Sequence, residues 1–305
     1  MQVHTLDKLN LSAPAGKRLV VLGDPIAHSL SPAMHNAALQ TMVGEFLELA
    51  GWRYEAVHVP AAELAKALPI LHAAGVAGIN LTIPHKVRVL EIIEDVEKTA
   101  RCMGAVNTLI RTPTGYRGTN TDGFGILKAI EESFHRSLAD GDIWLYGAGG
   151  AARGIVVACL EAGARRITIL NRTTDRLREL EADLRAQALP GLDRVRFCTL
   201  EEAPRDMDPD AILINATSLG LKSADPSPID SSCLRPGMVV YDTTYGAVSQ
   251  LARDCGQARV AYADGLSMLV WQGVKSLEIW TGRPVPAARM REAALDELRK
   301  RTQNG

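Results

Sequence analysis

The stretch formed by residues 142–176 constrains the fold of this chain more than any other part of the sequence. A short apolar run at 143–146 stops at a glycine-rich turn, GAGGAA, at 147–152, and an alanine-rich segment follows. A second apolar run comes at 167–170. A strand, a helix and a strand within about 30 residues form a βαβ unit, which predicts two parallel strands joined by a helical crossover.

The turn at 147–152 indicates a dinucleotide site. A tight turn needs positive φ, and a pyrophosphate reaches backbone amides only where no Cβ blocks it. The following helix offers its unpaired N–H groups and positive dipole end to the anion. Ala152 stands where the third glycine of G-x-G-x-x-G often does, and the position between strand and helix argues against an ordinary βα turn. We expect cofactor contacts from Gly147, Ala148, Gly149, Gly150 and Ala151.

The end of the second strand predicts which dinucleotide binds. NAD sites usually place Asp or Glu there, and that carboxylate would repel a 2′-phosphate. This chain has Asn171-Arg172-Thr173 instead, with Arg176 one turn further along. Paired guanidinium groups suit a phosphate dianion, which predicts NADP(H) bound by these four residues. The alternative is a solvated basic helix start.

The bulk composition fits a soluble globular protein of two domains. The chain has 305 residues, 47% of them hydrophobic and 23% charged, and a formal net charge of −1. This charge gives no reason to expect nucleic acid or a membrane as partner, and no apolar run has the length of a membrane span or a signal peptide core. Five scattered cysteines fit reduced thiols in the cytoplasm, and seven histidines without ligand spacing predict no metal. The sequence leaves the oligomeric state open, including a homodimer.

Two serines mark a candidate anion site in the first half of the chain. The segment GDPIAHSLSPAMHN follows an apolar run at 19–22. Ser31 before Pro32 is the pattern of an N-cap followed by proline at the first helical position. The hydroxyls of Ser29 and Ser31 would converge on this helix start and could bind a substrate carboxylate, although capping alone is the alternative.

Three further polar residues are candidates for chemistry. Lys86 falls in the first turn of a helix that Pro84 opens, where the dipole disfavours a cation and makes the ammonium a better proton donor. A surface lysine is the alternative. Asn107 lies in a strand suited to burial, so its amide is either a structural cross-link or a ligand contact. Asp122 precedes a helix and is either an N-cap or a functional carboxylate.

Taken together, these motifs resemble those of the shikimate dehydrogenase family. The matching motifs are GDPIAHSLSPxMHN, NLTIPHK, GAVNT, NTDG, GAGGAAR, NRTxxR, NATSLG and DGLSMLVWQ. They occur in the family's order and cover nearly the whole chain after residue 18. The resemblance is therefore specific, although no single motif would be.

The resemblance implies an α/β protein of two domains. Residues 18–122 and 266–305 would form an α/β substrate-binding domain, with the C-terminal helices returning to it. Residues 123–265 would form a Rossmann-like, doubly wound NADP-binding domain. Residues 1–17 would be a mobile N-terminal extension.

The resemblance also implies reversible NADP-dependent reduction of 3-dehydroshikimate to shikimate, a step toward the aromatic amino acids. Lys86 would exchange the proton on the reacting oxygen, and Asp122 would orient it. The other residues would bind substrate or cofactor. Those expected at the substrate are Ser29, Ser31, Asn80, Thr82, Asn107, Tyr245 and Gln272. Those expected at the cofactor, besides the turn and the basic cluster, are Asn215, Ala216, Thr217, Thr243, Gly265 and Met268.

One segment departs from the family pattern. After Tyr245 most members carry a longer segment with proline and threonine, whereas this chain has Gly-Ala-Val-Ser at 246–249.

Two other functions are alternatives to this one. An NAD-dependent quinate/shikimate dehydrogenase would carry an acidic residue in place of Arg172 and often a bulkier residue than Ser31. A catalytically silent nucleotide-binding regulator would have no reason to keep Lys86 together with Asp122.

Overall fold

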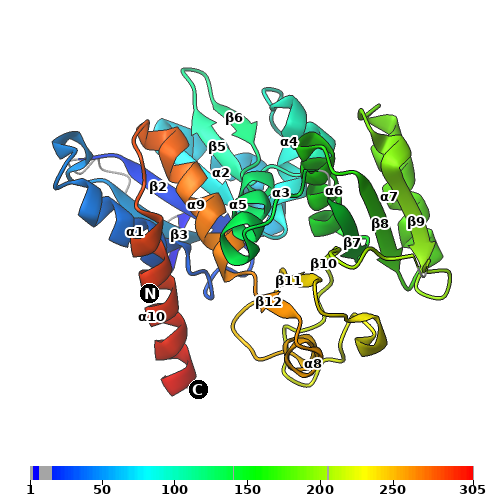
Figure 1. Cartoon of the computed structure of the whole chain (residues 1–305). Coiled ribbons are helices and arrows are strands. Elements are labelled where there is room, and N and C mark those ends of the chain that lie inside the picture. Colours follow the sequence, from blue (N-terminus) through cyan, green and yellow to red (C-terminus); the bar gives the residue numbers. More distant parts are fainter. Residues whose placement is uncertain (1–2, 7–15, 140, 205, 305) are drawn as a thin grey trace. The chain divides into compact units, whose positions relative to one another are not determined.

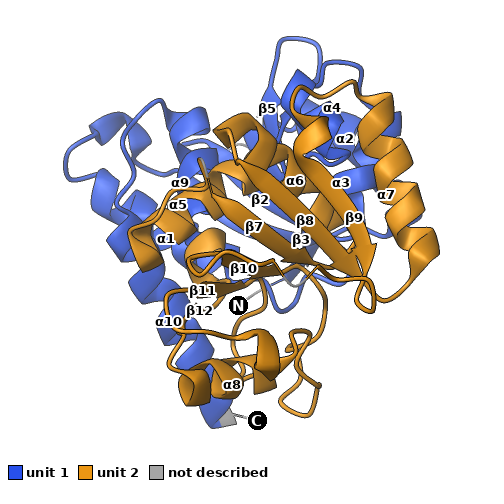
Figure 2. Cartoon of the chain, turned by 45° about the vertical axis from the view of Figure 1, so that its right-hand side comes forward, with its two compact units in different colours: residues 1–121, 270–305 blue, residues 122–269 orange. Residues whose placement is uncertain are grey.

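The chain divides into two compact units in the computed structural model, which describes residues 3–139, 141–204 and 206–304 apart from 7–15. Unit 1 comprises residues 1–121 and 270–305, and unit 2 comprises residues 122–269 (Figure 2). Each unit is built on one six-stranded sheet. The α/β class, with a discontinuous first unit and a Rossmann-like second unit, is confirmed. The division falls at residues 121/122 and 269/270, where the sequence suggested 122/123 and 265/266.

The sheet of unit 1 has the order β1-β3-β2-β4-β5-β6. Its first four strands run parallel and its last two pair antiparallel. The strands are β1 (Val3–Thr5), β2 (Arg18–Gly23), β3 (Arg53–His58), β4 (Gly78–Leu81), β5 (Thr108–Arg111) and β6 (Tyr116–Thr119). All six residues of β2 are buried, as expected for a central strand covered on both faces.

The expected N-terminal extension needs one correction. Val3–Thr5 pair in parallel with residues 56–58 of β3 and so form an edge strand of the sheet. Two β-branched residues in the sequence Val-His-Thr suit such a strand. Residues 7–15 of the expected extension lie outside the described residues.

The helices of unit 1 include one from each end of the chain. They are α1 (Ser31–Met42), α2 (Leu64–Ala73), α3 (His85–Arg88), α4 (Lys98–Met103), α10 (Ala287–Asn304) and the second part of α9 (Leu266–Thr281), with 3₁₀ turns at Leu47–Leu49, Ala61–Glu63 and Val89–Glu91. Helix α10 packs along α1, and α1 also packs on β3 (Figure 1). The C-terminal segment therefore completes the first unit.

Unit 2 is an all-parallel, doubly wound sheet. The strands are β7 (Asp142–Tyr146), β8 (Arg166–Asn171), β9 (Val195–Thr199), β10 (Ile212–Asn215), β11 (Val239–Asp242) and β12 (Ala261–Ala263), in the order β12-β11-β10-β7-β8-β9. The helices are α5 (Asp122–Phe134), α6 (Gly150–Ala162), α7 (Thr174–Ala186), α8 (Gln250–Ala258) and the first part of α9, with 3₁₀ turns at Leu192–Arg194 and Ser231–Cys233. The strand order reverses between β7 and β10, where ligands of such sheets bind.

Apolar side chains from strands and helices form a separate core in each unit. In unit 1 the core includes Val20, Leu22 and Leu71, and in unit 2 it includes Trp144 and Val240. Among the described residues, no helix combines the length and the hydropathy needed to cross a membrane.

Candidate active site

Seven of the predicted substrate-binding and catalytic residues belong to unit 1. They are Ser29 and Ser31 after β2, Asn80 and Thr82 at the end of β4, Lys86 in α3, Asn107 before β5 and Gln272 in α9. Because β2 and β4 are parallel and β5 is antiparallel to β4, the ends of β2 and β4 and the start of β5 meet at one edge of the sheet. Tyr245 and Asp122, also predicted, belong to unit 2.

Asn107 is a buried cross-link at this edge. Its Oδ1 accepts the backbone N–H of Thr121 at 2.8 Å, and its Nδ2 donates to Thr121 Oγ1 at 2.9 Å. The same Nδ2 lies 3.4 Å from Oε1 of Gln272, which is 165 residues away in the sequence. The structure therefore brings two predicted ring-hydroxyl residues together.

The amide of Asn80 is occupied by protein groups. Nδ2 donates to the carbonyl of Asn107 at 3.0 Å, to Thr108 Oγ1 at 3.1 Å and to Ser276 Oγ at 3.1 Å. Oδ1 accepts from the Tyr54 hydroxyl at 2.7 Å. Both amide hydrogens are thus used inside the unit, which gives Asn80 a structural role at the site.

The predicted N-cap of α1 is wrong by one residue. Leu30 is the N-cap, since its φ of −87° and ψ of −14° already turn the chain toward the helix, and Ser31 is the first helical residue. The backbone N–H of Ser31 donates to Ser29 Oγ at 3.3 Å. The Ser31 hydroxyl is therefore not used for capping.

Lys86 lies in a short helix whose N-cap is Pro84. Helix α3 is a single turn of four residues and continues as a 3₁₀ turn at Val89–Glu91. A helix of one turn has a small dipole, so the argument from the helix start loses most of its weight. The backbone N–H of Val106 donates to the Lys86 carbonyl at 2.8 Å, which holds α3 beside the segment that carries Asn107.

Asp122 begins α5 and is the first residue of unit 2. It directly follows Thr121, whose backbone N–H and hydroxyl bind Asn107. The predicted acid is thus attached through one peptide bond to the hydrogen-bonded edge of unit 1.

The glycine turn of unit 2 has the geometry that a pyrophosphate site needs. Gly147 has a φ of +117°, and a Cβ there would lie 3.0 Å from the carbonyl of Ala216. At Gly149 and Gly150 a Cβ would meet no atom within 4 Å. The protein's own packing does not require glycine at these two positions, and the backbone at the start of α6 is open there.

The guanidinium groups of the basic cluster after β8 differ in their partners. Arg172 is exposed and forms no hydrogen bond or ion pair with any residue that the structure describes. Arg176 pairs with Glu179 at 3.1 Å on the exposed face of α7. The amide of Asn171 donates to the Thr173 carbonyl at 3.0 Å and shapes the turn between them. No carboxylate occurs at residues 171–174, so the cluster fits a phosphate.

Asn215 shapes the loop after β10. This buried side chain accepts from the backbone N–H of Thr217 at 2.9 Å and from its hydroxyl at 2.7 Å. It donates to Asp242 at 2.9 Å. Ala216 donates its N–H to the carbonyl of Tyr146, so this loop is anchored beside the glycine turn.

Asp242, which the sequence analysis did not single out, anchors the segment that departs from the family. This buried carboxylate accepts from the backbone N–H and hydroxyl of Thr244 and from the Tyr262 hydroxyl at 3.1 Å. Ser249 lies 3.5 Å from it and also caps α8 by accepting the N–H of Ala252. The short segment after Tyr245 is therefore held at both of its ends.

Gly265 and Thr243 pack too closely for a side chain at Gly265. A Cβ there would lie 2.2 Å from the Thr243 carbonyl, and the N–H of Gly265 donates to the Thr244 carbonyl. Met268 then donates its N–H to the Tyr241 hydroxyl at 3.0 Å. These contacts fix the start of α9.

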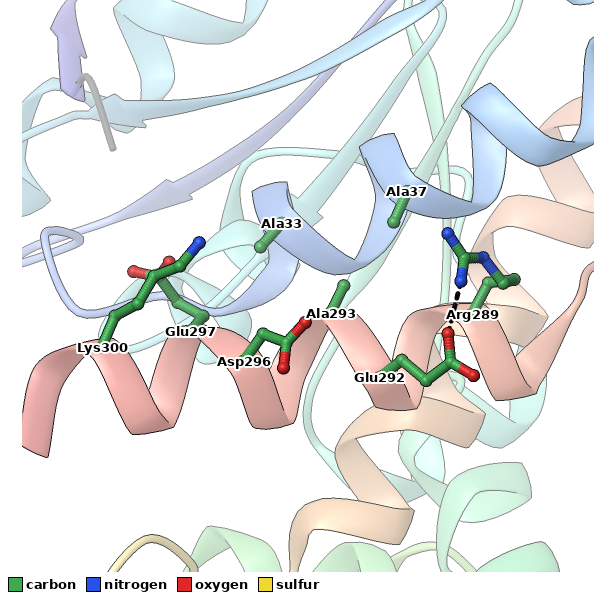
Figure 3. Close-up of a pocket in the computed structure, with 8 residues that line it drawn as sticks. All are labelled: Ala33, Ala37, Arg289, Glu292, Ala293, Asp296, Glu297 and Lys300. Carbon is green, nitrogen blue, oxygen red and sulfur yellow. Dashed lines mark hydrogen bonds and ion pairs between the residues drawn. The ribbon is translucent and has the colours of Figure 1, made fainter.

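A surface hollow of about 250 Å³ between α1 and α10 lies apart from the predicted residues (Figure 3). Ala33 and Ala37 line it from α1, and five charged side chains line it from α10, among them the ion pair of Arg289 with Glu292. It contains none of the predicted site residues. Among the described residues, no group of three or more His, Cys, Asp or Glu side chains could hold a metal ion.

Models of three domains match the chain. The shikimate dehydrogenase substrate binding domain matches residues 21–109, the shikimate / quinate 5-dehydrogenase model matches 129–221, and the shikimate 5′-dehydrogenase C-terminal domain matches 265–295. The shikimate dehydrogenase (NADP⁺) of Symbiobacterium thermophilum is 39% identical over 93% of this chain and 95% of that protein. The chain belongs to the shikimate dehydrogenase family.

Solved structures of shikimate dehydrogenases share the whole fold. One, a complex with NADP⁺, has a TM-score of 0.82 and 31% identity over 93% of this chain and 96% of that chain. Another, from Thermus thermophilus in complex with NADP(H) and shikimate, has a TM-score of 0.79 and 32% identity over 92% and 99% of the two chains. The predicted family and enzyme class are confirmed.

The shikimate dehydrogenase matches cover most of the predicted site. The substrate-binding match includes the edge from Ser29 to Asn107, and the C-terminal match includes Gln272. The segment after Tyr245 falls between the second and third matches. Sequence reasoning missed several residues that support the site, namely His35, Asn36, Tyr54, Asp242 and Ser276. The signal for the first two was present, because both belong to the SPAMHN motif.

Proposed function

We propose that this protein catalyses the reversible NADP-dependent reduction of 3-dehydroshikimate to shikimate, with Lys86 and Asp122 as the catalytic pair. The observation that supports this best is the contact of Asn107 with Gln272 at the edge of the sheet of unit 1 where β2, which precedes the two serines, also ends. Family membership supports the NADP-dependent oxidoreductase class.

The substrate is a small ring with a carboxylate and several hydroxyl groups, which polar side chains can bind at separate ends. Ser29 and Ser31, with Tyr245, hold the carboxylate. Thr82, Asn107 and Gln272 bind the ring hydroxyls. The contact of Asn107 with Gln272 at 3.4 Å puts two of these amides within reach of one ligand.

The chain's own residues contribute proton transfer and charge stabilisation. NADPH, when bound, supplies the hydride. Lys86 donates a proton to the ketone oxygen as negative charge develops there, and takes it back in the reverse direction. Asp122 accepts a hydrogen bond from the Lys86 ammonium or, once that oxygen is protonated, from the resulting hydroxyl group. The carboxylate thereby orients the proton transfer.

The cofactor is held by groups of unit 2. The backbone at residues 147–151 and the N-terminus of α6 bind the pyrophosphate. Arg172 binds the 2′-phosphate with Asn171, Thr173 and Arg176, and the loops with Asn215, Ala216, Thr217, Thr243, Gly265 and Met268 border the remainder.

Initial rates with shikimate and quinate, each with NADP and with NAD, test this function. We expect shikimate with NADP to give the highest kcat/KM, because Arg172 replaces the acidic residue of NAD sites. A preference for quinate with NAD would support the quinate/shikimate alternative instead. Absence of turnover with both substrates would favour the silent regulator.

Lys86→Ala tests the catalytic pair. We expect kcat to fall by about 100-fold or more, because a positioned general acid contributes at least that much. The KM for shikimate should change little, as expected for a group that acts mainly in the transition state. Lys66→Ala, an exposed lysine of α2, is the matched control and should leave both constants unchanged. An unaltered kcat in Lys86→Ala would exclude the lysine from proton transfer.

A further inference from the structure

The loop at residues 24–30, which leads to the two serines, is anchored at each of its ends. At its start, the Asp24 carboxylate accepts a hydrogen bond from His58 at 2.8 Å and from the backbone N–H of Ala61 at 3.3 Å. At its end, Leu30 is buried and leads into α1. Residues 27 and 28 between these anchors are exposed, so packing does not hold the middle of the loop.

Arg301 of α10 supports the middle of this loop. Its Nη1 donates to the His28 carbonyl at 2.9 Å, and its Nη2 donates to the Ser29 carbonyl at 3.4 Å. Among the residues that the structure describes, no other group donates to these two carbonyls. Arg301 therefore ties the loop to the C-terminal segment of unit 1.

The guanidinium of Arg301 is held in place by a neighbour on the same helix. Glu297, one turn earlier, accepts from Nη2 at 3.0 Å and from Nε at 3.2 Å. Each contact of Arg301 can use a different N–H, because a guanidinium carries more N–H groups than these contacts need. The planar group can thus bind the carboxylate and both carbonyls at the same time.

Helix α10 brings Arg301 to the loop by packing along α1 (Figure 3). Nε of Arg289, near the start of α10, donates to the Thr41 hydroxyl near the end of α1 at 3.4 Å, whereas Arg301, near the end of α10, reaches the residues before α1. The two helices are therefore antiparallel. Met290 and Ala294 of α10 are fully buried, so packing of the helix sets the position of Arg301.

We propose that Arg301 is a positioning residue for the substrate carboxylate and acts through the backbone of Ser29. This inference rests on the proposed function, in which Ser29 and Ser31 bind that carboxylate. When its carbonyl is fixed, Ser29 keeps its Oγ where it accepts the N–H of Ser31 at 3.3 Å. The hydrogen of the Ser29 hydroxyl forms no bond within the described residues, so it is available to a carboxylate.

The expected effect is on the geometry of binding rather than on long-range attraction. Glu297 neutralises the guanidinium, and salt screens charges at the surface. Without Arg301, the two carbonyls can bind water, and the loop gains conformations in which the serines point elsewhere. If the competent conformation is populated for about one tenth to one third of the time, the apparent dissociation constant rises about 3- to 10-fold.

Arg301→Ala tests the proposal. The KM for shikimate should rise about 3- to 10-fold, while kcat and the KM for NADPH stay within about twofold of wild type, because Lys86 and the cofactor residues are unchanged. Arg299→Ala is the matched control, since Arg299 is exposed on the same helix and pairs with Asp296 at 3.2 Å. It should leave all of these constants unchanged.

Arg301→Lys tests whether the fork of the guanidinium matters. An ammonium can still donate to a carbonyl, but it lacks the planar geometry that serves both carbonyls and Glu297 together. The KM for shikimate should therefore lie between those of Arg301→Ala and wild type. A KM as high as that of Arg301→Ala, with normal kcat, also fits the proposal, because it assigns the effect to the fork.

Amide hydrogen exchange tests the loop without any substrate. Peptides that cover the loop should exchange faster in Arg301→Ala than in Arg299→Ala, because the loop opens more often. Equal exchange in the two variants, or an equal KM for shikimate, would overturn the proposal. Lack of shikimate turnover by the wild-type protein, with the difference in exchange present, would instead overturn the proposed function and leave Arg301 as a support of the loop alone.

Discussion

At the scale of single residues, two side chains of the same type can have different partners in this protein. Arg172 and Arg176 follow the same strand, yet Arg176 is paired with Glu179, whereas Arg172 has no partner among the described residues. An exposed ion pair contributes little to stability, but it competes with a ligand for the guanidinium. We therefore expect Arg172 to contribute more to phosphate binding than Arg176.

Arg172→Ala should weaken binding of NADPH specifically. A hydrogen bond between charged groups contributes about 1.5–3 kcal/mol, which corresponds to roughly 10- to 100-fold in the KM for NADPH. The KM for NADH should change little, because NADH has no 2′-phosphate. Steady-state kinetics with both cofactors measure this difference.

Arg178→Ala is the matched control on α7, since Arg178 is also exposed and pairs with Asp175. It should leave the ratio of the two cofactor KM values unchanged. Equal increases for NADPH and NADH in Arg172→Ala would refute the assignment of the 2′-phosphate site.

At the scale of elements, α1 joins the two serines that we propose to bind the substrate carboxylate to the sheet. His35 and Asn36, adjacent on α1, both contact Tyr54 of β3. The buried ring of His35 also faces Trp280 of α9 at 6.1 Å between centroids. A change in the charge of His35 would therefore affect three elements of unit 1 together.

The stability of unit 1 should depend on the protonation of His35. Burial, only partly offset by the hydrogen bond to the Ser31 carbonyl, lowers the pKa of His35 from its ordinary 6.5 to about 4. The unfolded chain thus binds a proton more readily than the folded one. The contribution of His35 to the free energy of unfolding is therefore fully present above pH 6.5. It falls by roughly 3 kcal/mol in total as the pH decreases toward 4.

Urea unfolding at several pH values measures this effect by comparing wild type with His35→Gln. The difference in unfolding free energy between the two proteins should shrink between pH 6.5 and 4. His28→Gln, which removes an exposed histidine before α1, should follow the wild-type profile. A difference that is constant over this range would show that His35 does not titrate on unfolding.

At the scale of the whole molecule, the two units differ in how they use the chain. All six strands of unit 2 come from the continuous segment 122–269. Unit 1 needs residues from both ends of the chain. Helix α10 packs on α1, and Ser276 of α9 forms hydrogen bonds with Asn80, Thr108 and Thr121. Loss of the C-terminal segment should therefore affect the two units unequally.

A chain that ends at Leu269 should keep cofactor binding and lose substrate binding. Its unit 2 is complete, whereas its unit 1 lacks Gln272, Ser276 and the helix that covers α1. A saturating ligand stabilises a folded unit by about 2.7 kcal/mol at 100 times its Kd. NADPH should thus raise the Tm of the truncated chain, and shikimate should not.

The intact chain, which should respond to both ligands, is the reference for this experiment. A shikimate-dependent rise in Tm for the truncated chain would contradict the dependence of unit 1 on residues 270–305. Loss of the NADPH response would show that unit 2 does not fold independently.

The parts of the fold that were predictable are those encoded by local physics. The βαβ unit at residues 142–171, its glycine turn and the basic residues after it follow from side-chain periodicity, positive φ and charge, which act within a few residues. The start of α1 was misjudged by one residue, because helix ends depend on backbone geometry that several sequences can adopt.

The sequence by itself determined the order of the elements, the class of cofactor and most of the residues expected at the site. Only the tertiary structure decided how those residues are supported. Tyr54 meets Asn80 across 26 positions, and Asn80 meets Ser276 across 196. Such pairs have no local signal, because a buried polar group needs a partner in space and the chain distance to that partner is set by the packing of the sheet and helices.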